Sequence, residues 1–314
     1  YHGSGIMTGS LTGLPSFHQY FDLPIERVKH TTCPHWYRNA PAGMNETQFV
    51  AYCVEELEQL IAREGADTIA AFIGEPVMGT GGILPPPAGY WPAIQEVLKK
   101  HDILLISDEV VCGFGRLGSK MGAQHYGMTP DLITVAKGLT SAYAPLSGVI
   151  VSEGVWDVID KASEEFGPMG HGWTYSGHPI CAAAALANLD ILERENLTQN
   201  AAQTGAYLLE QLHAAFDSHP LVGEVRGVGM LAALEFMADK EARRPFDPAL
   251  KVGPRVSAAA LQRGLIARAM PHGDILGFAP PLVTSRDEVD EIVKLARAAV
   301  DEVASQVLTP AAAV

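Results

Sequence analysis

The stretch ILLISDEV, residues 103–110, is an apolar run that ends in a pair of acidic residues. A second apolar run, LITVAKG at residues 132–138, ends in a lysine. Runs of this length bounded by polar residues are typical of buried strands, and the chain between them is long enough for a loop, a short helix and a return strand. If the two runs are neighbouring strands, Asp108 and Lys137 lie at the same edge of one sheet.

A lysine and an aspartate placed together in this way are what pyridoxal phosphate chemistry requires. The lysine holds the cofactor covalently, and the aspartate keeps the pyridine nitrogen protonated so that the ring accepts electrons. Burial beside an apolar strand would lower the pKa of Lys137, so that its amine is neutral part of the time. The pattern therefore predicts Lys137 as the catalytic residue and Asp108 as a cofactor ligand. The alternatives are a lysine that reaches solvent and an aspartate that begins an ordinary loop.

Composition narrows the classes of partner. A chain of 314 residues is long enough for two domains with cores of their own. Hydrophobic residues make up 47% of the chain, yet Gly, Pro or charge interrupts every apolar run before it reaches the length of a membrane span. The net charge of −14 argues against nucleic acid and anionic membranes as partners. A cofactor phosphate must therefore be held by local dipoles.

The cysteines and histidines give no sign of cross-links or metal. Cys33, Cys53, Cys112 and Cys181 are scattered without a CxxC pair, which indicates reduced thiols in a cytoplasmic protein. The 11 histidines show no metal-ligand spacing such as HExxH, so no metal site is predicted. No signal peptide is visible, and because the chain begins at Tyr1 rather than Met, we expect an N-terminal part to be missing.

Strand and helix patterns alternate in the first half of the chain. They are expected at residues 46–63 (helix), 68–73 (strand), 90–101 (helix), 103–108 (strand), 120–126 (helix), 132–137 (strand) and 146–152 (strand). This alternation predicts an α/β domain with a largely parallel sheet. Two helices, at 179–194 and 197–218, then follow.

The pattern changes in the last third of the chain. Two strands are expected within residues 222–236, a helix at 254–263, short strands at 265–269 and 275–278, and an amphipathic helix at 286–307. That order is typical of an α+β fold. We therefore expect a large domain at residues 1–199 and a smaller C-terminal domain at residues 200–314.

Six short motifs follow one another in a characteristic order. They are YHG at 1–3, GEP at 74–76, DEV at 108–110 with GFGR at 113–116, AKG at 136–138 and TYSGHP at 174–179. Together they make the chain resemble the class III aminotransferases, pyridoxal phosphate enzymes of fold type I, over nearly its whole length. Val111 and Cys112, after the acidic pair, make it most similar to the amine:pyruvate, or ω-transaminase, branch.

The resemblance implies further cofactor-binding residues. Tyr1, followed by His2, would stack on one face of the cofactor ring, and Val110 would pack on the other. Glu75 would lie near the cofactor and order the site, or simply hold its own loop. Thr174 would donate to the cofactor phosphate of the opposite subunit, which makes a homodimer the expected assembly, or would cap a helix. A frayed Tyr1 and an ordinary core valine remain as alternatives.

The resemblance also implies substrate-binding residues. Arg268 matches an arginine that binds the carboxylate of a keto acid and moves away when the substrate carries an uncharged substituent. A guanidinium can form two hydrogen bonds with one carboxylate. Thr80 stands where ornithine- and GABA-type relatives place a glutamate that pairs with this arginine, which favours the pyruvate-using branch. Trp173 would line the substrate pocket. A surface arginine and a structural tryptophan are the alternatives.

The expected activity follows from these residues together. An amino group would pass from an ω-amino acid, diamine or simple amine to pyruvate, in ping-pong half-reactions through pyridoxamine phosphate. The partners would be small-molecule amines and keto acids. Two other interpretations stay open: an aminomutase or decarboxylase on the same fold, and a truncated, non-catalytic remnant.

Overall fold

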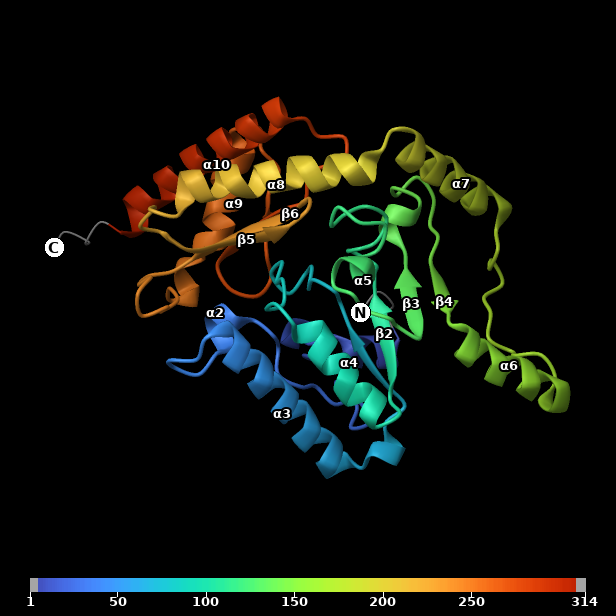
Figure 1. Cartoon of the computed structure of the whole chain (residues 1–314). Coiled ribbons are helices and arrows are strands. Elements are labelled where there is room, and N and C mark those ends of the chain that lie inside the picture. The colour runs from blue at the N-terminus through green and yellow to red at the C-terminus, as the bar shows by residue number, and fades with distance from the viewer. Residues whose placement is uncertain (1–4, 309–314) are drawn as a thin grey trace.

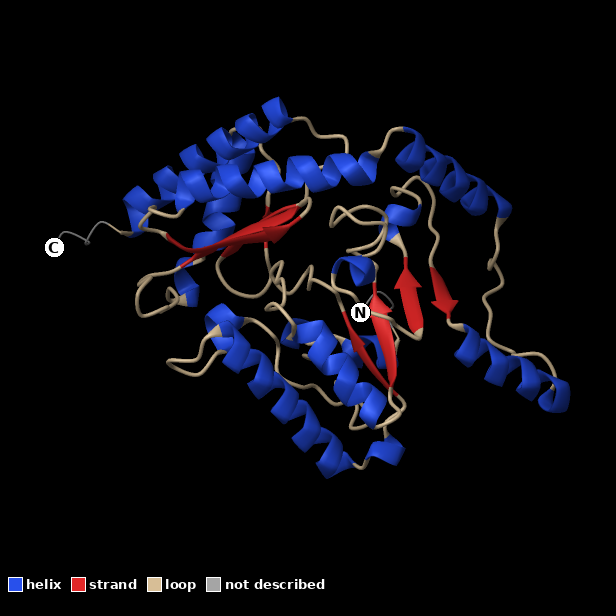
Figure 2. Cartoon of the chain, viewed as in Figure 1, coloured by secondary structure: helices blue, strands red, loops and turns tan. Residues whose placement is uncertain are grey.

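The structure is a computed structural model that describes residues 5–308 (Figure 1). The described strands form two four-stranded sheets, one in the order β1-β2-β3-β4 and the other in the order β5-β6-β8-β7. Figure 2 shows the two sheets as separate groups of strands, each with its own helices.

The first sheet confirms the expected strand pairing. Strands β1 (Ala71–Gly74), β2 (Leu104–Asp108) and β3 (Leu132–Val135) are parallel neighbours, and β4 (Gly148–Val151) pairs antiparallel with β3. Asp108 is in register with Thr134, three residues before Lys137. The carboxyl ends of three parallel strands therefore meet at one edge of this sheet.

Seven helices surround or follow the first sheet within the described residues. They are α1 (Ile6–Leu11), α2 (Trp36–Asn39), α3 (Glu46–Glu64), α4 (Tyr90–Lys100), α5 (Gly122–His125), α6 (Glu153–Phe166) and α7 (Pro179–Arg194). Helix α3 begins with a capping box between Asn45 and Gln48, and its apolar stripe packs on α4. Phe49, Trp91 and Leu105 belong to the buried cluster that joins these two helices to the sheet.

The second sheet is antiparallel and has a core of its own. Its elements are α8 (Leu197–Phe216), β5 (Val222–Val228), β6 (Leu231–Phe236), α9 (Val252–Gln262), β7 (Arg268–Ala269), β8 (Ile275–Phe278) and α10 (Arg286–Val307). Every residue of β6 is buried. Helices α8, α9 and α10 lie over the sheet in Figure 1, and the cluster that they form with it contains buried residues from Leu208 to Ala304 only.

Most element boundaries agree with the sequence patterns. The exceptions are the predicted strand at 265–269, which is reduced to the two residues of β7, and the helices α1, α2 and α6, which were not predicted. The boundary proposed between the large and the small domain, at residues 199 and 200, lies inside helix α8. The division into two domains stays a prediction. Among the described residues, no helix is long and apolar enough to cross a membrane.

Candidate active site

Three polar side chains lie at the carboxyl edge of the first sheet. Glu75 follows β1, Asp108 ends β2, and Lys137 lies two residues after β3. Because these three strands are parallel neighbours, the structure brings together residues that are far apart in the sequence. The predicted pair of Asp108 and Lys137 is thus placed at the carboxyl ends of adjacent strands, and Glu75 lies at the end of the third.

Lys137 occupies an unusual backbone conformation in a charged neighbourhood. Its φ of 39° is in the left-handed region, which costs a side-chain-bearing residue about 1 kcal/mol and is typical of functional sites. Asn188 steadies the turn after it by donating to the carbonyl oxygen of Gly138 at 2.8 Å. Burial lowers the pKa of Lys137, the charges of Asp108 and Glu75 oppose that shift, and the charge of Arg268 adds to it. Arg268 thus acts electrostatically on the predicted catalytic amine.

One carboxylate oxygen of Asp108 is held by a backbone N–H group of the loop that follows β2. Its Oδ1 accepts from the backbone N–H of Val110 at 3.0 Å. Beside it, the buried hydroxyl of Thr134 has no hydrogen-bond partner among residues 5–308. The sequence analysis did not single out Thr134, because its place opposite Asp108 depends on the strand register. A buried polar atom without a partner is rare in proteins, so this position fits a ligand group near Asp108.

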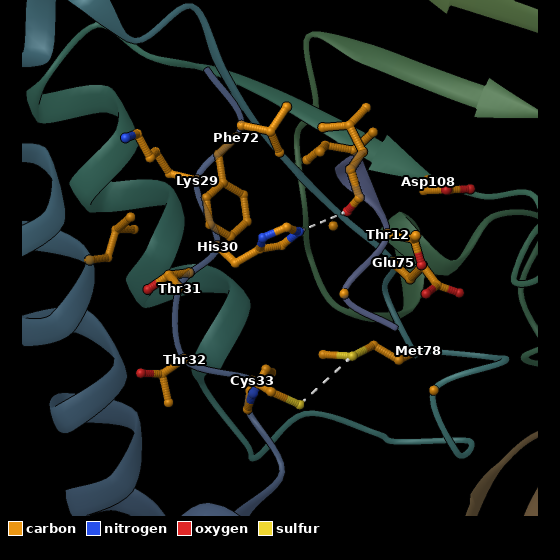
Figure 3. Close-up of a pocket in the computed structure, with 18 of the residues that line it drawn as sticks. Thr12, Lys29, His30, Thr31, Thr32, Cys33, Phe72, Glu75, Met78 and Asp108 are labelled. Atoms are coloured by element: carbon orange, nitrogen blue, oxygen red, sulfur yellow. Dashed lines mark hydrogen bonds between the residues drawn. The ribbon is translucent and has the colours of Figure 1, made fainter. Parts of the chain in front are cut away.

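Glu75 faces a large cavity. Burial raises the pKa of Glu75 to about 7, the N–H of Gly79 donated to Oε2 at 2.9 Å opposes the rise, and the charge of Asp108 adds to it. Glu75, Asp108 and Thr80 all line a cavity of about 1010 Å³. In Figure 3, Asp108, Thr12, Glu75 and Met78 lie along one side of this cavity, and residues 29–33 lie along the other. Lys137 lines a separate cavity of about 320 Å³.

Glu109, the second member of the acidic pair, serves the fold. Its side chain is fully buried, and its carboxylate accepts from the backbone N–H groups of Gly122 at 2.8 Å and Ala123 at 2.6 Å. These two residues open the short helix α5. Glu109 therefore ties the loop after β2 to α5 and holds the strand end that carries Asp108.

The remaining predicted residues fall into three groups. Val110 is buried next to Asp108. Trp173, 87% exposed, and the exposed Thr174 lie on the segment between α6 and α7, and neither lines the two cavities. Tyr1 and His2 lie outside the described residues.

Solved structures of transaminases share this fold, at sequence identities that differ widely. A transaminase from a study of directed evolution by ancestral reconstruction is 84% identical with a TM-score of 0.96, and the match covers 98% of this chain and 67% of that one. The ω-transaminase from Pseudomonas jessenii in complex with PMP is 44% identical with a TM-score of 0.95, over 99% of this chain and 68% of that one. The fold is therefore that of the pyridoxal-phosphate-dependent transferases of fold type I, an α/β fold with a mostly parallel sheet.

The family follows from the sequence as a whole. The profile described as aminotransferase class-III matches residues 1–300, and the chain therefore belongs to the class III aminotransferases. It is 66% identical to the diaminobutyrate–2-oxoglutarate transaminase of Halomonas elongata over 305 residues. That match covers 96% of this chain and 65% of the relative, so the chain spans just under two thirds of the length of that protein.

Class III aminotransferases depend on pyridoxal phosphate, and the residues at the sheet edge fit that group. A carboxylate at Asp108 suits a protonated pyridine nitrogen, and an amine of lowered pKa at Lys137 suits the cofactor aldehyde. The unpartnered hydroxyl of Thr134 adds a polar group beside Asp108. The carboxylate expected at the cofactor nitrogen and the amine expected at the cofactor aldehyde thus lie at the ends of two adjacent strands.

Proposed function

We propose that this chain catalyses transamination between an amine or ω-amino acid donor and a keto acid, with pyruvate as the acceptor. The observation that carries the proposal is the placement of Lys137 and Asp108 at the ends of adjacent parallel strands. Family membership supports the reaction type. An aminomutase or decarboxylase would share the same sheet edge, but the solved relatives with this fold are described as transaminases.

Each residue at the edge has a role that follows from its surroundings. Bound pyridoxal phosphate supplies an electron sink for the substrate carbon. Lys137, whose pKa burial lowers, is the group that takes up and returns the proton at that carbon through its Nζ. Asp108, with one oxygen held by Val110, balances the charge of the cofactor nitrogen. Glu75 and Thr80 form part of the wall of the adjoining cavity.

The choice of acceptor rests on Arg268 and Thr80. Arg268 is exposed on the edge strand β7, and its charge acts on Lys137, so a carboxylate bound by its guanidinium would lie near the amine. Thr80 offers no negative charge to compete for that arginine. The relative from Halomonas elongata is named for 2-oxoglutarate. Because Thr80 stands where ornithine- and GABA-type relatives place a glutamate, we nevertheless expect pyruvate to be preferred over 2-oxoglutarate by about tenfold in kcat/KM, and we propose to compare the two acceptors directly.

The assignment of Lys137 has a direct test. Purified wild-type protein incubated with pyridoxal phosphate should keep a visible absorbance band after dialysis and should consume amine donors with pyruvate. Lys137→Ala should lose the band and lower the turnover at least a thousandfold, because the covalent attachment and the proton carrier disappear together. Lys120→Ala is the matched control, since Lys120 is an exposed lysine paired with Glu193. A variant at Lys137 with an unchanged spectrum would sink the assignment.

We also propose that the chain forms a homodimer through the face that α6, α7 and the segment between them present. The apolar side chains exposed on this face include Trp156, Phe166, Trp173, Ile180 and Leu186. A monomer rarely exposes so many large apolar groups together, and Thr174, the predicted donor to the partner's cofactor, lies among them. Sedimentation equilibrium should show a dimer that weakens in Trp156→Asp; a wild-type chain that stays monomeric at micromolar concentration contradicts the proposal.

A further inference from the structure

The guanidinium group of Arg226, on strand β5 of the second sheet, binds a turn that lies between β1 of the first sheet and α4. Its Nε donates to the carbonyl oxygen of Ile83 at 2.8 Å, and its Nη2 donates to that of Gly82 at 2.7 Å. The residue is only 7% exposed. These carbonyl groups belong to the turn 78–84, which is closed by backbone hydrogen bonds between Met78 and Leu84. A planar guanidinium can hold two such acceptors at once.

Charged neighbours fix Arg226 in this position. Its Nη1 donates to Glu235 and to Glu224, both at 2.5 Å, and Glu235 is fully buried. Arg38 also pairs with Glu235, and the ring of His35 lies 3.2 Å from Glu224. Burial works to raise the pKa of Glu224, but His35 and Arg226 hold it below its usual value. His35, Glu224 and Glu235 could together ligate a cation, but the two arginines already pair with the two carboxylates.

The same turn reaches the candidate active site. The backbone N–H groups of Gly82 and Ile83 donate to the carbonyl oxygen of Gly79 at 3.1 and 2.9 Å. The N–H of Gly79 in turn donates to the Glu75 carboxylate at 2.9 Å. One tight turn therefore separates the guanidinium of Arg226 from the carboxylate that faces the cavity, and Thr80 lies within that turn.

We propose that Arg226 is a positioning residue for the active site: by holding the carbonyl groups of the turn 78–84, it fixes Glu75 and Thr80 in the cavity wall. The inference rests on the proposed function, because the proposed reaction gives these two side chains their roles. Through Arg226, the second sheet thereby fixes one wall of the cavity at the edge of the first sheet. Without the guanidinium, two buried carbonyl oxygens lose their donor, and the turn would open to find water.

Amide hydrogen exchange tests the clamp without any bound cofactor. In Arg226→Met, the peptide covering residues 76–85 should exchange about tenfold faster than in the wild-type protein. In Arg226→Lys, whose ammonium cannot hold two carbonyl groups as a fork, the rise should be about threefold. The matched control is Arg38→Met, which removes an ion pair to the same Glu235 but leaves both carbonyl contacts in place. Residues 90–100 of α4 should keep their wild-type rates in all three variants.

The outcomes separate a clamp from a general structural role. A wild-type exchange rate at residues 76–85 in both Arg226 variants would overturn the inference, and so would an equal increase at residues 90–100. If Arg226→Met does not fold, Arg226→Lys decides alone. Exchange of residues 76–85 at the wild-type rate in that variant would overturn the inference, and faster exchange would support it. A chain that binds no pyridoxal phosphate would refute the proposed function, yet the exchange result would still decide the role of Arg226.

The loaded protein provides a second readout. Because Thr80 is in the clamped turn and is a predicted substrate contact, Arg226→Lys should raise the KM for the keto acid about fivefold and leave the KM for the amine donor unchanged. Loss of folded protein alone would lower kcat without this split. A fall in kcat with both KM values unchanged would therefore contradict positioning of the substrate side of the cavity.

Discussion

Asp108 and Glu109 are neighbours in the chain, yet their carboxylates serve different parts of the molecule. Asp108 ends β2 beside the unpartnered hydroxyl of Thr134, and Glu109 binds the first turn of α5. Burial raises the pKa of Glu109, while the two N–H groups of α5 and Ser107 oppose that shift. The acidic pair thus combines a residue for the site with a residue for its support, and motif recognition alone does not separate the two roles.

Glu75 should make the stability of the cofactor-free protein depend on pH. Burial raises its pKa from 4.5 to about 7, so the native state keeps a proton that the unfolded chain releases above pH 4.5. The protonated Glu75 side chain therefore contributes stability that is lost as the pH rises from about 4.5 to about 7. Over that range the free energy of unfolding should fall by up to about 3 kcal/mol. Glu75→Gln removes this loss, so its stability relative to wild type should increase between pH 5 and pH 8.

Urea unfolding at several pH values measures this difference. The exposed Glu96, which pairs loosely with Lys99, provides a control: Glu96→Gln should follow the wild-type protein across the range. If the free-energy difference between Glu75→Gln and wild type stays constant from pH 5 to pH 8, Glu75 does not carry the raised pKa in the folded protein.

At the scale of helices and strands, local sequence signals explain why α10 could be predicted and why α6 was missed. The apolar spacing of residues 286–307 and the capping residue Ser285 define α10 as the sequence indicates. Helix α6 was missed because Ser152 was assigned to the preceding strand, whereas its hydroxyl accepts from Val155 as a helix cap. None of the residues of α6 is fully buried among the described residues, although Val155, Ile159 and Ala162 are partly buried.

The start of α10 makes a second prediction. Ser285 and Glu288 form a capping box, in which the Ser285 hydroxyl accepts from the N–H of Glu288 at 3.3 Å and the Glu288 carboxylate accepts from the N–H of Ser285 at 2.8 Å. Ser285→Ala should lower the free energy of unfolding by about 1 kcal/mol. Ser163→Ala, inside α6, removes a hydroxyl bonded only to Asp160 and should be neutral or slightly stabilising. Equal effects of the two changes in urea unfolding would exclude a capping role.

At the scale of the whole molecule, the site depends on contacts that no local pattern contains. The ends of three strands could be predicted from the sequence because each apolar run closes on a polar residue. The clamp by Arg226 could not, because it joins residues more than 140 positions apart. Arg116 crosses the same junction, donating to the carbonyl oxygens of Met230 at 3.3 Å and Pro280 at 2.6 Å. The two sheets are therefore held against each other by arginines that bind backbone carbonyl groups.

Close backbone packing completes this junction and gives the last prediction. A Cβ atom at Gly205 in α8 would overlap the carbonyl group of Gly229, and one at Gly229 would overlap the backbone of Leu117. Gly205→Ala should therefore lower the free energy of unfolding by about 3 kcal/mol, although alanine is otherwise the better helix former. Gly154→Ala in α6, where a Cβ meets nothing within 4 Å, should raise it by about 0.5 kcal/mol. Thermal and urea unfolding of both variants would show whether the junction tolerates a methyl group; a stabilised Gly205→Ala would mean that α8 and the loop before β6 do not pack this closely.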